Sequence, residues 1–168
     1  FIQRQEGAGL SGEQRQVLEH QLCDFRLAGI GLPAERKERF RIVSEELSRL
    51  QSKFDENVLD STNAWSRTVT DPRELDGLPA AVIEQARVLA TERGVAGWVL
   101  ALQQPTYVAV MSEADAETLR RDFYEAWCTR ASDRGPTAGR YDNTPVMQAI
   151  MALRHEQALA DPDPERIA

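Results

Sequence analysis

Apolar residues recur every three or four positions along most of the chain, a spacing that predicts amphipathic helices. Ser11 and Gln14 form a capping-box pair that marks the start of the first helix. Gly29 can end that helix, because glycine readily adopts the left-handed conformation. The apolar face between these two signals consists of Val17, Leu18, Leu22, Phe25 and Ala28.

A second helix is predicted from Ala34 to about Ser66, because neither Gly nor Pro occurs before Pro72. Its apolar residues alternate in steps of three and four and so form a seam for a partner helix: Phe40, Val43, Leu47, Leu50 and Phe54. Such a helix would be roughly 50 Å long, whereas a compact globule of this chain length is about 40 Å across. We therefore expect an elongated helical lobe, or one that more protein surrounds.

Charged residues four positions apart are expected to support the exposed face of this long helix. The pairs are Glu35 with Arg39 and Glu45 with Arg49, each with the acidic residue first. Pairs of this kind stabilise helices weakly.

Strand-like composition is confined to Thr68–Thr70, Trp98–Leu102 and Thr106–Met111. The last two stretches are predicted to pair as a small antiparallel ribbon. Helices are expected from Pro79 to Arg93, after a cap at Ser112, and from Thr144 onwards. The predicted fold class is therefore mainly α, an elongated helical lobe with one long helix and a small antiparallel β-ribbon.

The net charge of −7 disfavours nucleic acid and membrane surfaces as partners, because both are anionic. Cys23 and Cys128 lie far apart within predicted helices, which indicates reduced core thiols in a cytoplasmic protein. The chain begins at Phe1 without an initiator Met, and we therefore expect it to be a fragment. The polar segment 161–168 is expected to be a frayed tail.

The His155-Glu156 pair begins like HExxH, the helical zinc motif in which two histidines four residues apart bind the metal. The second histidine would stand at position 159, where this chain has Leu159. One imidazole alone cannot hold zinc, so a solvated helix end is the preferred interpretation. With His20 as the only other histidine and no GxSxG motif, the sequence predicts no catalytic, cofactor-binding or metal-binding residue.

Asn57, Asp60 and Asn63 lie three residues apart on the long helix. They carry one formal charge between them, which is too little for a site of Ca²⁺ or Mg²⁺. Two interpretations remain: the side chains contact substrate, or they form hydrogen bonds to neighbouring helices or loops. We favour the second, structural role. Gly135 and Gly139 lack the spacing of a phosphate-binding loop and are interpreted as turn residues.

Five long stretches of this chain resemble the oligopeptidase A and thimet oligopeptidase family of zinc metallopeptidases. They are "LSRLQSKFDENVLDSTNAW", "VTDPRELDGLP", "GWVLALQQPTYVAVM", "LRRDFYEAWCTRASD" and "DNTPVMQAIMALRHEQA", in the order and spacing of the family. The resemblance extends from Leu22 to about Ala158. It ends at "LADPDPERIA", where the family usually continues into an "LLG"-like stretch.

The resemblance implies an intracellular, mostly helical enzyme that hydrolyses short peptides in a channel between two lobes. Residues 1–160 would form the helical amino-terminal lobe, one wall of that channel. Zinc would be bound in the full-length parent by ligands outside this sequence, so this part alone is expected to bind no zinc and to be inactive. The lobe's partners would be short peptides and the missing catalytic lobe.

A different class of function is a free-standing helical module that binds peptides or proteins without catalysis. The coding sequence beyond Ala168 separates the two hypotheses, because only the enzyme needs an HExxH helix there. A lobe without its counterpart would also expose apolar surface, and we expect self-association through the long helix or the final helix.

Overall fold

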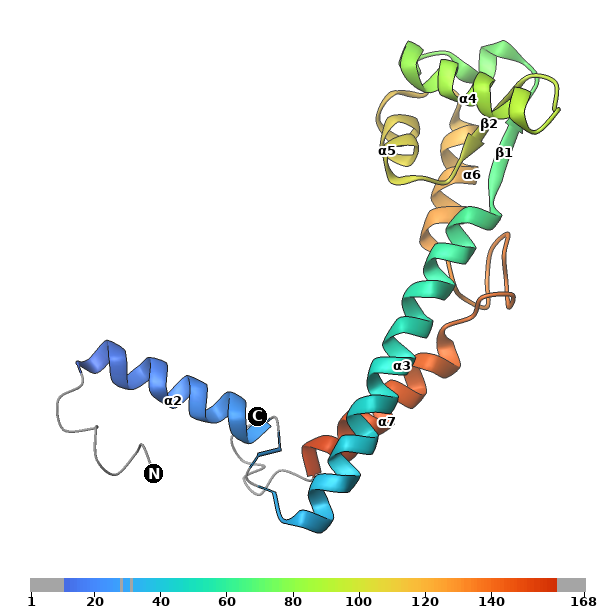
Figure 1. Cartoon of the computed structure of the whole chain (residues 1–168). Coiled ribbons are helices and arrows are strands. Elements are labelled where there is room, and N and C mark those ends of the chain that lie inside the picture. The colour runs from blue at the N-terminus through green and yellow to red at the C-terminus, as the bar shows by residue number, and fades with distance from the viewer. Residues whose placement is uncertain (1–10, 28, 31, 160–168) are drawn as a thin grey trace. The chain divides into compact units, whose positions relative to one another are not determined.

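The computed structural model describes residues 11–27, 29–30 and 32–159, and it is mainly helical with one small antiparallel sheet (Figure 1). The predicted fold class is confirmed in these respects. The expected tail 161–168 lies outside the described residues. The chain divides into two compact units: unit 1 comprises Phe1–Arg49 and Ala149–Ala168, and unit 2 comprises Leu50–Gln148.

Unit 1 begins with helix α2 (Gly12–Leu27), which has the predicted start and end. The Ser11 N–H donates to Gln14 Oε1 over 3.0 Å, and the Gln14 N–H donates to Ser11 Oγ over 3.2 Å. Gly29 has φ +79°, and a Cβ at this position would lie 2.9 Å from Cδ1 of Phe40. The capping box and the glycine stop are therefore both confirmed.

The long helix is α3 (Ala34–Ala64), which ends two residues before its predicted limit because Ser66 already belongs to strand β1 (Ser66–Val69). In unit 1, α3 lies beside the last part of helix α7 (Thr144–Leu159), as Figure 1 shows. Val43 and Leu47 of the predicted seam are buried there.

The prediction of charge pairs on α3 is wrong, because each arginine pairs with a carboxylate other than the predicted one. Arg39 pairs with Glu156 of α7 instead of Glu35, and Arg49 pairs with Glu46 instead of Glu45. A tertiary carboxylate or one three residues away competes with the fourth-neighbour partner that local spacing predicts.

The core of unit 2 surrounds an antiparallel pair of strands, β1 and β2 (Trp98–Ala101), in which Arg67 faces Leu100. The short helix η2 (Pro72–Leu75) follows β1 in the chain, and the next helix, α4 (Ala80–Glu92), packs on β2. Helices α5 (Gln104–Glu113) and α6 (Glu117–Cys128) pack against each other. The most deeply buried large side chains of this core are Phe123, Leu100, Leu102, Leu119, Val69, Val99 and Val110.

Residues Thr106–Met111 are helical, and the prediction that they form the second strand of the ribbon is wrong. The strand partner of β2 is β1, which precedes it by about thirty residues. Pro105 stands in the first turn of α5, where its fixed φ favours a helix start. The buried residues of α5 are Thr106, Ala109 and Val110, which follow helical spacing.

Two further expectations need correction. Ser112 lies inside α5 and does not cap the next helix, whose N-cap is Ala116 without a side-chain bond. Cys23 and Cys128 are free thiols as expected, but both are exposed instead of buried in a core. Among the described helices none combines the length and apolarity that crossing a membrane requires.

Candidate functional site

Asn57 is buried in the part of α3 that belongs to unit 2, and it bonds to the residue that precedes α7. Its Nδ2 donates to Oδ1 of Asn143 over 2.8 Å, and Nδ2 of Asn143 donates to the carbonyl of Phe54 over 3.0 Å. The two amides are 7 % and 2 % exposed. The structural role predicted for Asn57 is confirmed, because this pair attaches the start of α7 to α3.

Asp60 and Asn63 have exposed side chains, and the prediction that they bond to neighbouring elements is wrong. Their place is taken by Ser61, which the sequence analysis missed. Its Oγ accepts the N–H of Ala131 over 3.0 Å and lies 2.9 Å from the hydroxyl of Thr137. The signal was available, since Ser61 follows Asn57 by four residues and so lies on the same helix face.

The segment between Ala131 and Asn143 is a tightly folded loop held on α3. Ala131 has φ +50°, an uncommon conformation for a residue with a side chain. Its N–H is bonded by Ser61 and its carbonyl by the N–H of Asn143, over 2.9 Å. Gly135 and Gly139 have φ +76° and +70°, so their assignment as turn residues is confirmed.

Replacing Gly135 with alanine is expected to destabilise unit 2 by about 1–3 kcal/mol, because φ is positive and the space is filled. A Cβ at this position would come within 1.9 Å of the Thr129 hydroxyl. Gly139 has a similar φ but nothing within 4 Å of its Cβ position, so Gly139→Ala should cost less. Urea denaturation of both variants measures the difference, and equal losses would contradict this account.

His155 lies exposed on α7, and the neighbouring Glu156 is engaged by another residue. Arg39 Nε donates to Glu156 Oε1 over 2.5 Å, and its second nitrogen donates to Oε2 over 2.8 Å. This bidentate hydrogen bonding from Arg39 lowers the pKa of Glu156 below its ordinary value. The described residues contain no group of three or more His, Cys, Asp or Glu that could hold a metal ion.

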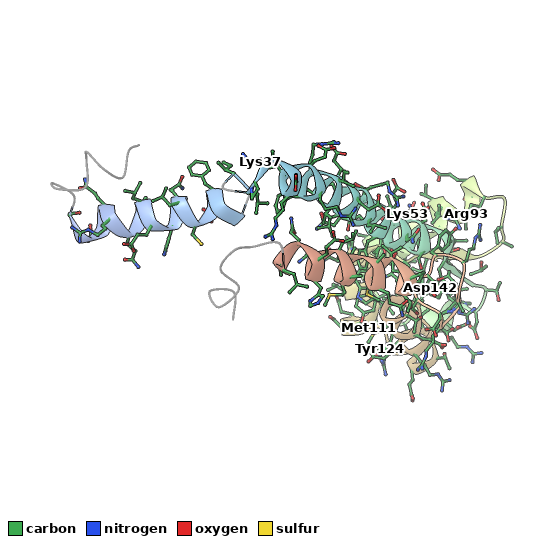
Figure 2. All side chains as sticks on the ribbon, turned by 90° about the horizontal axis from the view of Figure 1, so that it is seen from below. Lys37, Lys53, Arg93, Met111, Tyr124 and Asp142 are labelled. Carbon is green, nitrogen blue, oxygen red and sulfur yellow. The ribbon has the colours of Figure 1, made fainter. Side chains whose placement is uncertain are left out.

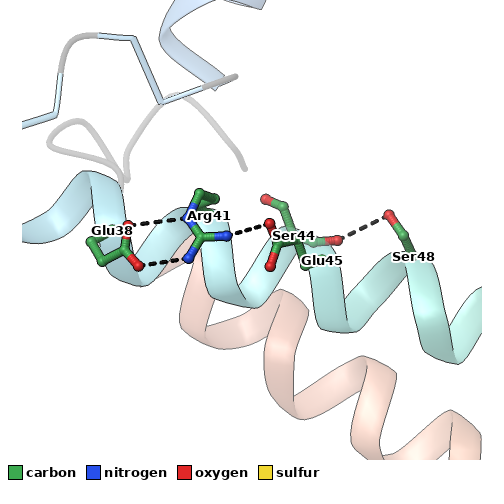
Figure 3. A network of polar contacts seen from close by, with 5 residues as sticks. All are labelled: Glu38, Arg41, Ser44, Glu45 and Ser48. Atoms are coloured by element: carbon green, nitrogen blue, oxygen red, sulfur yellow. Dashed lines mark hydrogen bonds and ion pairs between the residues drawn. The ribbon is translucent and has the colours of Figure 1, made fainter.

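The carboxylates of the first half of α3 form ion pairs on a solvated helix face. Figure 3 shows Arg41 between Glu38 and Glu45, with Ser48 donating to the carbonyl of Ser44 over 3.0 Å. Hydrogen bonds from Arg41 lower the pKa of Glu38, and those carboxylates raise the pKa of Arg41. Exposed pairs of this kind contribute little to stability, and the lowered pKa of Glu38 is the opposite of what a general acid needs.

Arg67 connects three elements of unit 2 through its guanidinium. Nε donates to Asp122 of α6 over 3.0 Å, and one terminal nitrogen donates to Glu74 of η2 over 3.2 Å. The other terminal nitrogen donates to the carbonyl of Thr68 over 2.9 Å. All of these donors are used within the fold, so the residue serves the structure of β1.

An aromatic stack joins α5 and α6, the two helices marked by Met111 and Tyr124 in Figure 2. The ring of Tyr107 lies 4.3 Å from that of Trp127 at an interplanar angle of 13°. The guanidinium of Arg130 covers the Trp127 ring at 3.4 Å from its centroid. Partial burial lowers the pKa of Arg130, and the cation–π contact offsets part of that desolvation.

The chain is similar to part of several peptidases, although no family model matches it. It is 42 % identical over 151 residues to oligopeptidase A of Salmonella typhimurium, which covers 90 % of this chain and 22 % of that protein. It is 34 % identical over 158 residues to organellar oligopeptidase A of Arabidopsis thaliana, covering 90 % of this chain and 19 % of that protein. It is 26 % identical over 157 residues to dipeptidyl carboxypeptidase of Escherichia coli, covering 93 % of this chain and 22 % of that protein. The chain thus spans about a fifth of the length of these relatives.

Proposed function

Because the chain belongs to the oligopeptidase A and thimet oligopeptidase family as a segment homologous to part of its members, we propose that it forms one wall of the peptide channel of a zinc oligopeptidase. The whole protein would hydrolyse short peptides in the cytoplasm. The chain would be its helical amino-terminal lobe, and the catalytic lobe would be supplied by sequence outside this chain.

The observation that carries this proposal is the extent of the similarity. The similarity, at 42 % identity, extends over nine-tenths of the chain and is therefore not confined to one helix. Exposed apolar residues of α7 also fit the proposal, since Met151 and Leu159 are each about two-thirds exposed, as expected of a face that another part of the protein covers.

The described residues do not fit a zinc site. Catalytic zinc needs three protein ligands and an open position for the water that it activates. His155 is exposed on α7, the residue one turn further on is Leu159, and Glu156 is bonded to Arg39. Zinc chemistry would therefore belong to the remainder of the protein, and no catalytic step is assigned to residues of this chain.

We expect the purified 168-residue chain to contain no stoichiometric zinc and to cleave no peptide, while the product of the complete gene does both. Elemental analysis after dialysis measures the metal, and a quenched-fluorescence peptide assay with and without added zinc measures cleavage. One zinc bound per 168-residue chain, with chelator-sensitive cleavage that His155→Ala abolishes, would overturn the assignment. A complete gene without an HExxH helix would instead support a binding module without catalysis.

A further inference from the structure

Unit 2 contains an apolar groove that none of the interactions described above uses. It has a volume of about 280 Å³ and lies between α4, β2 and the first turn of α5. Its apolar lining includes Val82, Ala86, Leu89 and Val99. We refer to it as the α4–β2 groove. Ligand pockets begin at about 300 Å³, so this slightly smaller groove can hold only a few side chains of a short segment of chain that lies along it.

Thr106 provides a polar group at the α5 end of the groove. The residue lines the groove and is only 7 % exposed. Within the described part of the chain the Thr106 hydroxyl takes part in no hydrogen bond. Every side-chain polar atom that is sealed from solvent in that part of the chain has a hydrogen-bond partner, so an unpaired hydroxyl must be open to solvent. The hydroxyl of this groove-lining residue is therefore open to solvent and has its hydrogen bond to offer to a ligand.

The N-terminus of α5 reinforces this polar end. Gln103 precedes the helix and lines the groove, but its side chain makes no capping bond. The backbone N–H groups of Gln104 and Thr106 have no acceptor among the described residues. Free N–H groups and the helix dipole together favour an anionic oxygen at this position.

One carboxylate lines the opposite end of the groove. Glu92 lines the groove from the last residue of α4, and the short connection 93–97 joins this helix to the start of β2. Glu92 therefore lies where β2 begins, and Thr106 lies beyond the point where β2 ends. Among the described residues Glu92 forms no ion pair. The groove thus has a carboxylate at one end and an anion-binding end at the other.

We propose that the α4–β2 groove binds a short peptide with free ends and aliphatic side chains. Its terminal carboxylate would accept hydrogen bonds from Thr106 and from the N-terminus of α5, and its amino group would face Glu92. Val82 and Glu92 are ten residues apart on α4, about 15 Å, which an extended peptide of roughly four residues spans. This site is argued from unit 2 alone and does not rest on the proposed channel.

Titration of the isotope-labelled 168-residue chain with the free acid of Ala-Val-Val-Leu tests the proposal by NMR. Backbone amides of the first turn of α5, of α4 and of β2 should shift together. The C-terminal amide of the same peptide should bind about tenfold more weakly or worse, because a hydrogen bond to a charged group is lost. Acetylation of the amino end should also weaken binding, through Glu92.

Thr106→Val removes the hydroxyl at nearly constant shape and should weaken binding of the free acid about tenfold. Thr118→Val on α6 is the matched control, because Thr118 is exposed and lies outside the groove, and it should leave affinity unchanged. Absence of shifts in the groove at millimolar peptide, or equal affinity for the acid and the amide, would overturn the proposal. The amide comparison uses the unmodified protein, so it remains decisive even if Thr106→Val fails to fold. Neither result bears on zinc content or cleavage by the complete gene product.

Discussion

Replacing Phe123 with alanine is expected to lower the free energy of unfolding of unit 2 by about 3–5 kcal/mol. Phe123 is fully buried in the core around β2, and its ring meets that of Trp65 edge-on at a centroid distance of 4.9 Å. Truncation removes these contacts and leaves a cavity that strands and helices cannot fill by small shifts. Since small domains are stable by only about 5–15 kcal/mol, the loss should be easy to detect.

Tryptophan fluorescence during urea denaturation measures this change, because Trp65, Trp98 and Trp127 all lie in unit 2. Tyr124→Ala is the matched control. Tyr124 is the next residue of α6 but is 55 % exposed, so its removal should change the free energy of unfolding by only about 0.5 kcal/mol. Equal losses for the two variants would show that this core is not packed as described.

Asn143→Leu is expected to destabilise unit 2 by about 2–4 kcal/mol, because it leaves the buried amide of Asn57 without its acceptor. The double variant Asn57→Leu, Asn143→Leu should lose less than the sum of the two single variants, since it leaves neither amide unpaired. Asn63→Leu serves as a control on the exposed face of α3 and should have little effect. Denaturation of the unsubstituted protein, the two single variants at Asn57 and Asn143 and the double variant gives the coupling energy, and simple additivity would contradict a direct bond between the two amides.

The sequence predicts the helices of this chain well where their ends carry their own signals. Ser11 with Gln14 and the positive φ of Gly29 act through neighbours only a few residues away. The prediction of a strand at Thr106–Met111 failed because local composition and tertiary packing favour different structures there. β-branched and aromatic residues indicate a strand, but packing of Thr106, Ala109 and Val110 on one side favours the helix that Pro105 starts. Tertiary contacts decided that conflict, and composition does not contain them.

The polar contacts of α3 show a second limit of sequence analysis. Asn57 and Asn143 are 86 residues apart, and Ser61 meets Ala131 across 70 residues. Only the helix face could be foreseen, by the four-residue spacing of Asn57 and Ser61. The spacing of three that drew attention to Asp60 and Asn63 turns those side chains progressively away from this face. The α4–β2 groove could not be predicted, since it depends on how a helix, a strand and a helix start meet.

The two cysteines provide one site for dye labelling in each of the two units. Cys23 belongs to unit 1 and Cys128 to unit 2, and both thiols are exposed. Exposed thiols react with maleimide reagents, so a donor and an acceptor dye can be attached without any substitution. Energy transfer between the dyes then measures the separation of the two units in solution.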